Sequence, residues 1–183
     1  QLLSIVVVGI AVALMLISPE MVLIFGSPKY REAVYVIPPV AASVFFIFIY
    51  NILSMPQFYY EKTQFLMAAS MAAAGANVVL NFIFIRLFGY IAAGYTTLAC
   101  YMLYSVGHYI VSKQILVNEG IQENLMNPGF LLACSVFLIG ASIICNLIFP
   151  YRILRYAILL ASAGLVFWKK ELLLKTMADI RKK

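Results

Sequence analysis

The sequence predicts an all-helical protein that crosses a membrane several times. Apolar residues make up 64% of the 183 residues, charged residues only 11%, and the mean hydropathy is +0.99. Soluble domains carry about a quarter charged residues, so this composition argues against a water-soluble fold. Long apolar runs follow one another along the chain, each near the length of about 20 residues that one helical crossing of a bilayer needs. Strict alternation of apolar and polar residues, which is typical of a membrane barrel, is absent.

The first three crossings are separated by short stretches of helix-breaking and charged residues. Gly26, Ser27 and Pro28 end the first apolar run. Pro38 and Pro39 lie near the start of the second run, and because proline lacks a backbone donor we expect them to bend or delay that helix. A polar link at 57–64 precedes the third run. We therefore expect crossings at 2–25, 33–55 and 65–86.

The last three crossings have equally recognisable ends. Gly89 predicts a tight turn before the fourth run. Asn127 followed by Pro128 is typical of an N-cap and the first residue of a helix. Pro150 marks the hairpin between the fifth and sixth runs. These signals predict crossings at 89–111, 129–149 and 152–168.

The distribution of lysine and arginine predicts the orientation. The side of the carboxy-terminal tail carries eight such residues and the opposite side five, so we expect a cytoplasmic carboxy terminus. The predicted organisation is four crossings in 1–112, a cytoplasmic link at 113–128 and two additional crossings in 129–168. The basic tail, 169–183, is expected to form an amphipathic helix on anionic lipid. Because Gln1 is followed at once by an apolar run, we interpret the chain as a piece that lacks its amino-terminal part.

The residues of common catalytic chemistry are scarce. The chain has one histidine, and its three cysteines (Cys100, Cys134 and Cys145) lie within apolar runs without the paired spacing of a metal site. No glycine-rich phosphate loop and no paired acidic motif is present. We therefore predict that the chain is not an enzyme, binds no metal or cofactor, and does not bind nucleic acid.

Polar residues inside the fourth crossing lie on one helical face. Gly94, Thr97, Tyr101, Tyr104 and His108 follow one another at spacings of 3, 4, 3 and 4. Such a face needs water, a ligand or a polar neighbouring helix. Helix–helix contact, with the glycine allowing close approach, is the alternative to a cavity. His108 is expected at the membrane interface.

The second and third crossings carry further polar residues. Ser70, Asn77 and Asn81 share a face of the third run, and the alanine-rich stretch 72–76 would let another helix approach closely. Amides are costly in hydrocarbon unless they are paired, so Asn77 and Asn81 are expected to face protein or a wet cavity. Tyr50 lies on one side of the second run. The candidate cavity residues are Thr97, Tyr101, Tyr104, Asn77, Asn81 and Tyr50.

Three charged residues are further candidates. Glu20 follows the helix-breaking Pro19, and a carboxylate inside a membrane points to function, for example cation binding. A solvated carboxylate at the interface is the alternative. Arg31 and Arg86 would contact diphosphate or carbohydrate carboxylates, or would extend to lipid headgroups.

Six stretches between residues 16 and 111 share their pattern of small and apolar residues with one family of transporters. The stretches are Leu16–Glu20, Ile24–Gly26, Tyr30–Ala33, Phe58–Thr63, Asn77–Asn81 and Phe88–Thr97. They resemble the polysaccharide (O-antigen and capsule) flippases of the multidrug/oligosaccharidyl-lipid/polysaccharide exporter superfamily, and the resemblance includes no catalytic signature.

This resemblance implies most of the second lobe of a two-lobe exporter plus two peripheral helices. It implies transport of polyprenyl-diphosphate-linked oligosaccharides from the cytoplasmic to the outer leaflet of a bacterial inner membrane, for O-antigen and lipopolysaccharide synthesis. The resemblance also implies that this transport is coupled to sodium ions or protons. Without the first lobe, the piece is expected to be inactive. A cation-coupled drug exporter of the same superfamily and a non-transport scaffold of a polysaccharide-synthesising complex are the alternatives.

Overall fold

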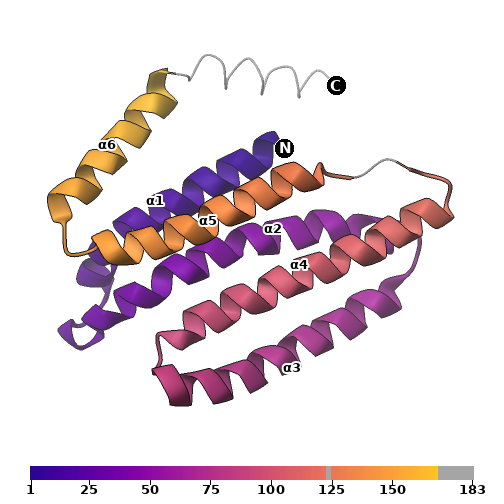
Figure 1. The fold of residues 1–183 in the computed structure, drawn as a ribbon, viewed down its shortest axis with the longest axis horizontal. Coiled ribbons are helices and arrows are strands. Elements are labelled where there is room, and N and C mark those ends of the chain that lie inside the picture. Colours follow the sequence, from indigo (N-terminus) through magenta and orange to yellow (C-terminus); the bar gives the residue numbers. More distant parts are fainter. Residues whose placement is uncertain (123–124, 169–183) are drawn as a thin grey trace. The chain divides into compact units, whose positions relative to one another are not determined.

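The computed structural model describes residues 1–122 and 125–168, and this part of the chain is helical throughout, with no strand (Figure 1). The all-helical prediction is therefore confirmed for those residues. One compact unit comprises Gln1–Asn146, and a second contains the last helix. The elements are α1 (Leu2–Phe25), the 3₁₀ helix η1 (Pro28–Val36), α2 (Ile37–Tyr59), α3 (Thr63–Phe88), α4 (Ala92–Asn118), α5 (Pro128–Ile148) and α6 (Arg152–Trp168).

Four stretches of helix are long and apolar enough to cross a membrane. They are α1, the continuous stretch Lys29–Tyr59 that contains α2, α3, and α5. The other two helices differ, because α4 has 27 residues but a more polar composition, and α6 has 17 residues. The prediction of six crossings therefore stays a prediction.

The observed helix ends agree with the predicted ends for α1 and α6 and differ for α2. Residues 33–36 belong to η1, and α2 begins at Ile37 with Pro38 and Pro39 in its first turn, so the predicted delay is confirmed. The predicted link starting at Gln57 was wrong, since α2 continues to Tyr59. The Gln57 amide has polar partners on α4. Helix α4 continues beyond 111, to Asn118, into the predicted link at 113–128.

Within the first unit, α2 is the central helix. Helix α1 packs against it, α4 packs along it, and α3 packs on α4 (Figure 1). Phe45, Ile49 and Leu53 of α2 are almost completely buried, whereas α3 has no buried residue. Ala73 and Ala74 of the alanine-rich stretch 72–76 line a cavity shared with α4, so this stretch faces a neighbouring helix without being fully buried.

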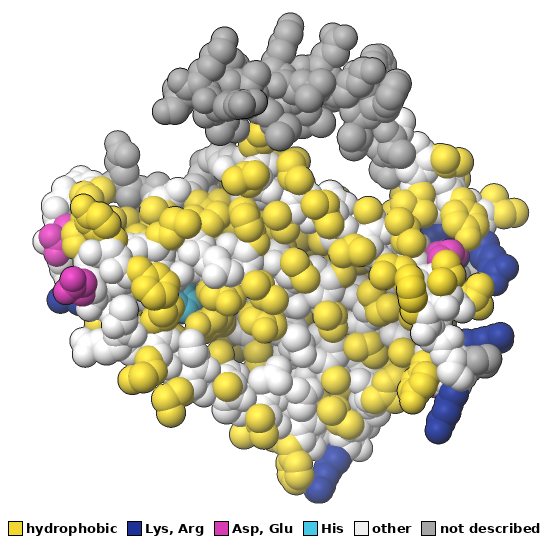
Figure 2. Space-filling model, turned by 180° about the vertical axis from the view of Figure 1, so that it is seen from behind, with side chains coloured by type: hydrophobic (Ala, Val, Ile, Leu, Met, Phe, Trp, Pro, Cys, Tyr) yellow, Lys and Arg dark blue, Asp and Glu magenta, His cyan; other side chains and the backbone are white. Residues whose placement is uncertain are grey.

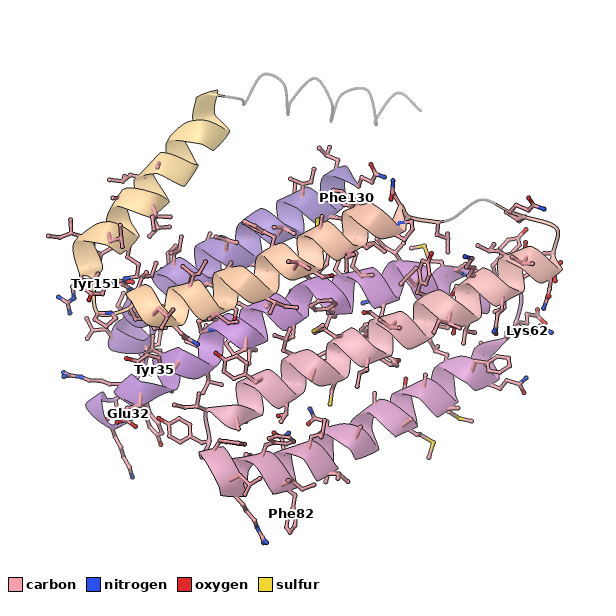
Figure 3. All side chains as sticks on the ribbon, in the orientation of Figure 1. Glu32, Tyr35, Lys62, Phe82, Phe130 and Tyr151 are labelled. Carbon is pink, nitrogen blue, oxygen red and sulfur yellow. The ribbon has the colours of Figure 1, made fainter. Side chains whose placement is uncertain are left out.

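Charged side chains lie mainly at the ends of the helices. Figure 3 places Glu32 and Lys62 near opposite ends of α2, and Figure 2 shows one face of the molecule, on which hydrophobic side chains occupy the wide area between charged ones. The predicted orientation stays a prediction. The predicted amphipathic tail, 169–183, lies outside the described residues.

Gly94 allows α4 to approach the start of α2. A Cβ atom at Gly94 would lie 2.8 Å from Cγ of Pro39 and 2.9 Å from the carbonyl oxygen of Val36. A carbonyl oxygen and a proline ring cannot move aside as a flexible side chain would. The close approach expected from the sequence is therefore present at this residue.

We predict that Gly94→Ala lowers the free energy of unfolding by about 1–3 kcal/mol, the usual cost of overpacking. Gly107→Ala is the control, because a Cβ atom there meets nothing within 4 Å. Both variants gain the same helix propensity. Thermal unfolding in detergent, followed by circular dichroism, should show a lower midpoint for Gly94→Ala only. Equal midpoints would contradict the close contact.

Candidate functional site

A polar cavity of about 510 Å³ lies between α2, α3 and α4. It brings together five of the six uncharged residues selected from the sequence, since Asn81 alone is not among the residues that line it. The lining residues are Tyr50, Ser70, Ala73, Ala74, Asn77, Val78, Thr97, Cys100, Tyr101 and Tyr104. None of them is charged.

Some of the polar residues that share a face of α3 or α4 form hydrogen bonds between these two helices. The hydroxyls of Ser70 and Tyr104 lie 2.6 Å apart. Thr96 donates to Oδ1 of Asn81 at 2.6 Å, and Nδ2 of Asn81 donates to Oδ1 of Asn77 at 2.8 Å. The interhelical contacts expected as the alternative to a cavity are therefore present from Ser70 to Tyr104 and from Thr96 to Asn81, and they hold α3 to α4. The bond between Asn81 and Asn77 lies within α3.

Other lining groups remain available to a ligand. The phenol hydroxyls of Tyr50 and Tyr101 make no hydrogen bond within the described part of the chain, and both side chains are half-buried. The Thr97 hydroxyl donates to the carbonyl oxygen of Ala93 at 2.8 Å and can still accept a hydrogen bond. The cavity thus offers aromatic faces with hydroxyl and amide groups, a combination suited to a polyhydroxylated ligand.

A buried polar cluster joins α2 to α4 next to this cavity. Nε2 of Gln57 donates to Nδ1 of His108 at 2.8 Å and to the Ser112 hydroxyl at 3.0 Å. Ser112 in turn donates to the carbonyl oxygen of Leu53. Gln57 and His108 are each only 1% exposed, so both side chains are packed inside the protein. The expected position of His108 at the membrane interface stays a prediction.

Gln57 is the functional-site residue that the sequence analysis missed. Because Gln57 is polar, it was assigned to the start of a link. However, Ser54 lies four residues after Tyr50, and Gln57 lies three residues after Ser54. That spacing places the three residues on one helical face and was the available signal. His108 was identified as part of a stripe, but its partner lies 51 residues away in the sequence.

The cluster is in direct contact with the tyrosines of the cavity. The His108 ring meets Tyr104 edge-on, with 4.5 Å between ring centroids, and stacks near Tyr50 at 5.7 Å. The two tyrosine rings are themselves 4.6 Å apart. Nδ1 of His108 faces Nε2 of Gln57, whereas Nε2 of His108 and Oε1 of Gln57 are buried without a hydrogen-bond partner in the described residues. The cluster therefore fixes the orientation of the aromatic side chains at one end of the cavity.

The three charged candidates do not line the cavity. Glu20 is half-buried in α1, and Arg31 is exposed in η1. The guanidinium of Arg86 lies 3.9 Å from the centroid of the Phe82 ring, on α3 itself. The cation binding expected of Glu20 and the diphosphate contact expected of Arg31 and Arg86 are therefore not part of this site.

One acidic contact lies at the turn between α3 and α4. The Tyr90 hydroxyl donates to Glu32 of η1 at 3.0 Å. Desolvation, the hydrogen bond and the negative charge of Glu32 raise the pKa of Tyr90 above its ordinary value. The hydrogen bond from the Tyr90 hydroxyl ties η1 to this turn.

In the described residues, no group of three or more histidine, cysteine, aspartate or glutamate side chains is placed to hold a metal ion. Cys100 and Cys145 are buried, Cys134 is half-buried, and none of the three forms a disulfide bond within the described residues. Comparisons of the chain with protein families, with curated proteins and with solved structures give no match. The flippase resemblance therefore stays a prediction.

We predict that Gln57→Leu lowers the free energy of unfolding by about 1–3 kcal/mol, because it leaves the buried Nδ1 of His108 without a partner and removes one of the two hydrogen bonds of the Ser112 hydroxyl. Asn51→Leu is the matched control on the same helix, since Asn51 is exposed and its amide only donates to the carbonyl oxygen of Ile47. Denaturant titration in detergent micelles would measure the free energy of unfolding of both variants. A cost for Asn51→Leu as large as that for Gln57→Leu would refute the role assigned to the cluster.

Proposed function

We propose that this chain is part of a bacterial inner-membrane transporter that moves polyprenyl-diphosphate-linked oligosaccharides from the cytoplasmic to the outer leaflet. The membrane location is supported by four stretches of helix that are long and apolar enough to cross a bilayer. A carboxy terminus on the cytoplasmic side belongs to the same proposal. The glycans concerned would be repeat units for surface polysaccharide such as O-antigen.

The observation that carries the proposal is the polar, uncharged cavity between helices whose outer surfaces are apolar. Its volume of about 510 Å³ falls in the range of about 300–1,000 Å³ that small-molecule sites occupy. Tyrosine rings pack against sugar faces, and hydroxyl and amide groups bond to sugar hydroxyls. Because the lining residues include no cation, the cavity suits the sugar portion of the substrate rather than its diphosphate.

A non-transport scaffold is the second candidate, and one observation favours it. The bonds from Ser70 to Tyr104 and from Thr96 to Asn81 show that polar residues of the stripes hold helices together. A drug exporter has less support, because no acidic residue lines the cavity to attract a cationic drug. No residue is assigned to a coupling ion.

The test replaces Thr97, Tyr101 and Tyr104 by leucine in the complete protein that contains this chain. We expect surface polysaccharide to fall about tenfold or more at a normal protein level, equivalent to a loss of about 1.4 kcal/mol in recognition. Tyr59→Leu is the control, since Tyr59 is 80% exposed and lies outside the cavity.

Surface polysaccharide and the amount of membrane-inserted protein are measured in the same cells. Normal polysaccharide in the triple variant would contradict a transport role for the cavity. Loss of the protein itself, with Tyr59→Leu unaffected, would support the scaffold candidate, because the residues would then serve packing alone.

A further inference from the structure

A second cavity, on a different face of α4, lies between α2, α4 and α5. Its volume is about 250 Å³, and its walls are formed mainly by apolar side chains such as Phe45, Ile49, Val106 and Leu132. Two serines also line it, but Ser105 donates to the carbonyl oxygen of Met102 and Ser135 to that of Leu131. The walls therefore offer almost no hydrogen bonding, and an occupant must be apolar.

The cavity is elongated along the helices. Its lining residues run from Phe45 to Leu53 on α2 and from Met102 to Tyr109 on α4. At about 1.5 Å per residue, the α2 stretch covers about 12 Å. If these helices cross a bilayer, this is also the direction in which the hydrocarbon chains of lipids run.

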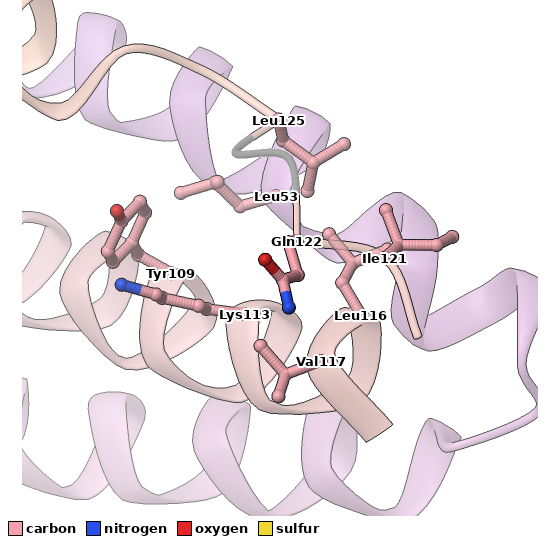
Figure 4. Close-up of a pocket in the computed structure, with 8 residues that line it drawn as sticks. All are labelled: Leu53, Tyr109, Lys113, Leu116, Val117, Ile121, Gln122 and Leu125. Atoms are coloured by element: carbon pink, nitrogen blue, oxygen red, sulfur yellow. The ribbon is translucent and has the colours of Figure 1, made fainter. Parts of the chain in front are cut away.

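A cation lies at one end of this cavity. Leu53 and Tyr109 also line a smaller pocket together with Lys113, which is exposed and lies one helical turn beyond Tyr109 (Figure 4). In Figure 4 the Lys113 side chain extends toward Tyr109 rather than toward Val117. Within the described part of the chain, its ammonium group forms no ion pair. The apolar cavity thus ends at a cation and a phenol.

We infer that this site binds one anionic phospholipid, with a hydrocarbon chain in the cavity between α2, α4 and α5 and its phosphate at Lys113 and Tyr109. Apolar walls match the chain, and a lysine at the membrane surface attracts an anionic headgroup. The lipid is a resident component rather than the transported molecule, because the polar cavity lies on another face of α4. The inference rests on the proposed membrane location and is independent of glycan transport.

Native mass spectrometry of the full chain in detergent tests this inference with phosphatidylglycerol and phosphatidylcholine of the same acyl chains. We expect the chain to retain phosphatidylglycerol in preference to phosphatidylcholine. Lys113→Gln should weaken phosphatidylglycerol binding about tenfold and remove the preference. Lys62→Gln is the matched control, because Lys62 is exposed and lines neither cavity, and it should bind as the unaltered chain does.

A second variant tests the hydrocarbon chain separately. Val106→Trp fills the cavity and should reduce the retention of both lipids, while circular dichroism confirms unchanged helix content. Equal binding by the Lys113 and Lys62 variants would overturn the inference, and so would full retention by Val106→Trp. Displacement of phosphatidylglycerol by an equal concentration of inorganic phosphate would also overturn it, since an ionic site alone would then explain binding. Because the readout is lipid binding, none of these results depends on whether the cavity between α2, α3 and α4 carries glycans.

Discussion

The contact between α2 and α4 includes a buried polar cluster whose hydrogen bonds run within the protein. Oε1 of Gln57 and Nε2 of His108 have no partner in the described residues. Gln57 reaches both His108 and Ser112, and Ser112 reaches the backbone of α2 at Leu53. Water is not available to replace these bonds at buried positions, so removal of one partner leaves unsatisfied groups on the others. At the other end of the interface, Gly94 permits the close approach of the same helices. These two constraints set the separation of α2 and α4, on which the polar cavity depends.

Helix α4 separates two chemically different environments. One face meets α3 through hydroxyl and amide groups and lines the polar cavity, while another faces the apolar cavity beside α5. This explains why α4 is more polar than α1, α3 or α5, since its hydrogen-bonding groups are turned toward other helices. In contrast, α3 buries no residue and is held mainly by α4, so its attachment depends on a small number of polar contacts.

The sequence was a good guide to helices and to polar faces, and a poor guide to polar partners. Periodic spacing grouped Thr97, Tyr101 and Tyr104 correctly, because the face of a helix follows from local geometry. Tyr50, Asn77 and Asn81 were also named as cavity candidates, but Asn81 does not line the cavity, since the rotation of one helix against another is decided by packing. Gln57 was misassigned for the same reason: its partner His108 is distant in the sequence, and only a tertiary contact makes a buried glutamine favourable.

The account depends most on the claim that water enters the cavity between α2, α3 and α4 while the outer surface of α4 faces hydrocarbon. Cysteine reactivity measures this directly, because a hydrophilic thiol reagent needs an ionised thiol in contact with water. In a chain with Cys100, Cys134 and Cys145 replaced by alanine, Thr97→Cys tests the cavity and Leu103→Cys the outer surface, where Leu103 is 66% exposed. In membranes, we expect rapid labelling at position 97 and none at position 103. Labelling at 103 but not at 97 would contradict the account.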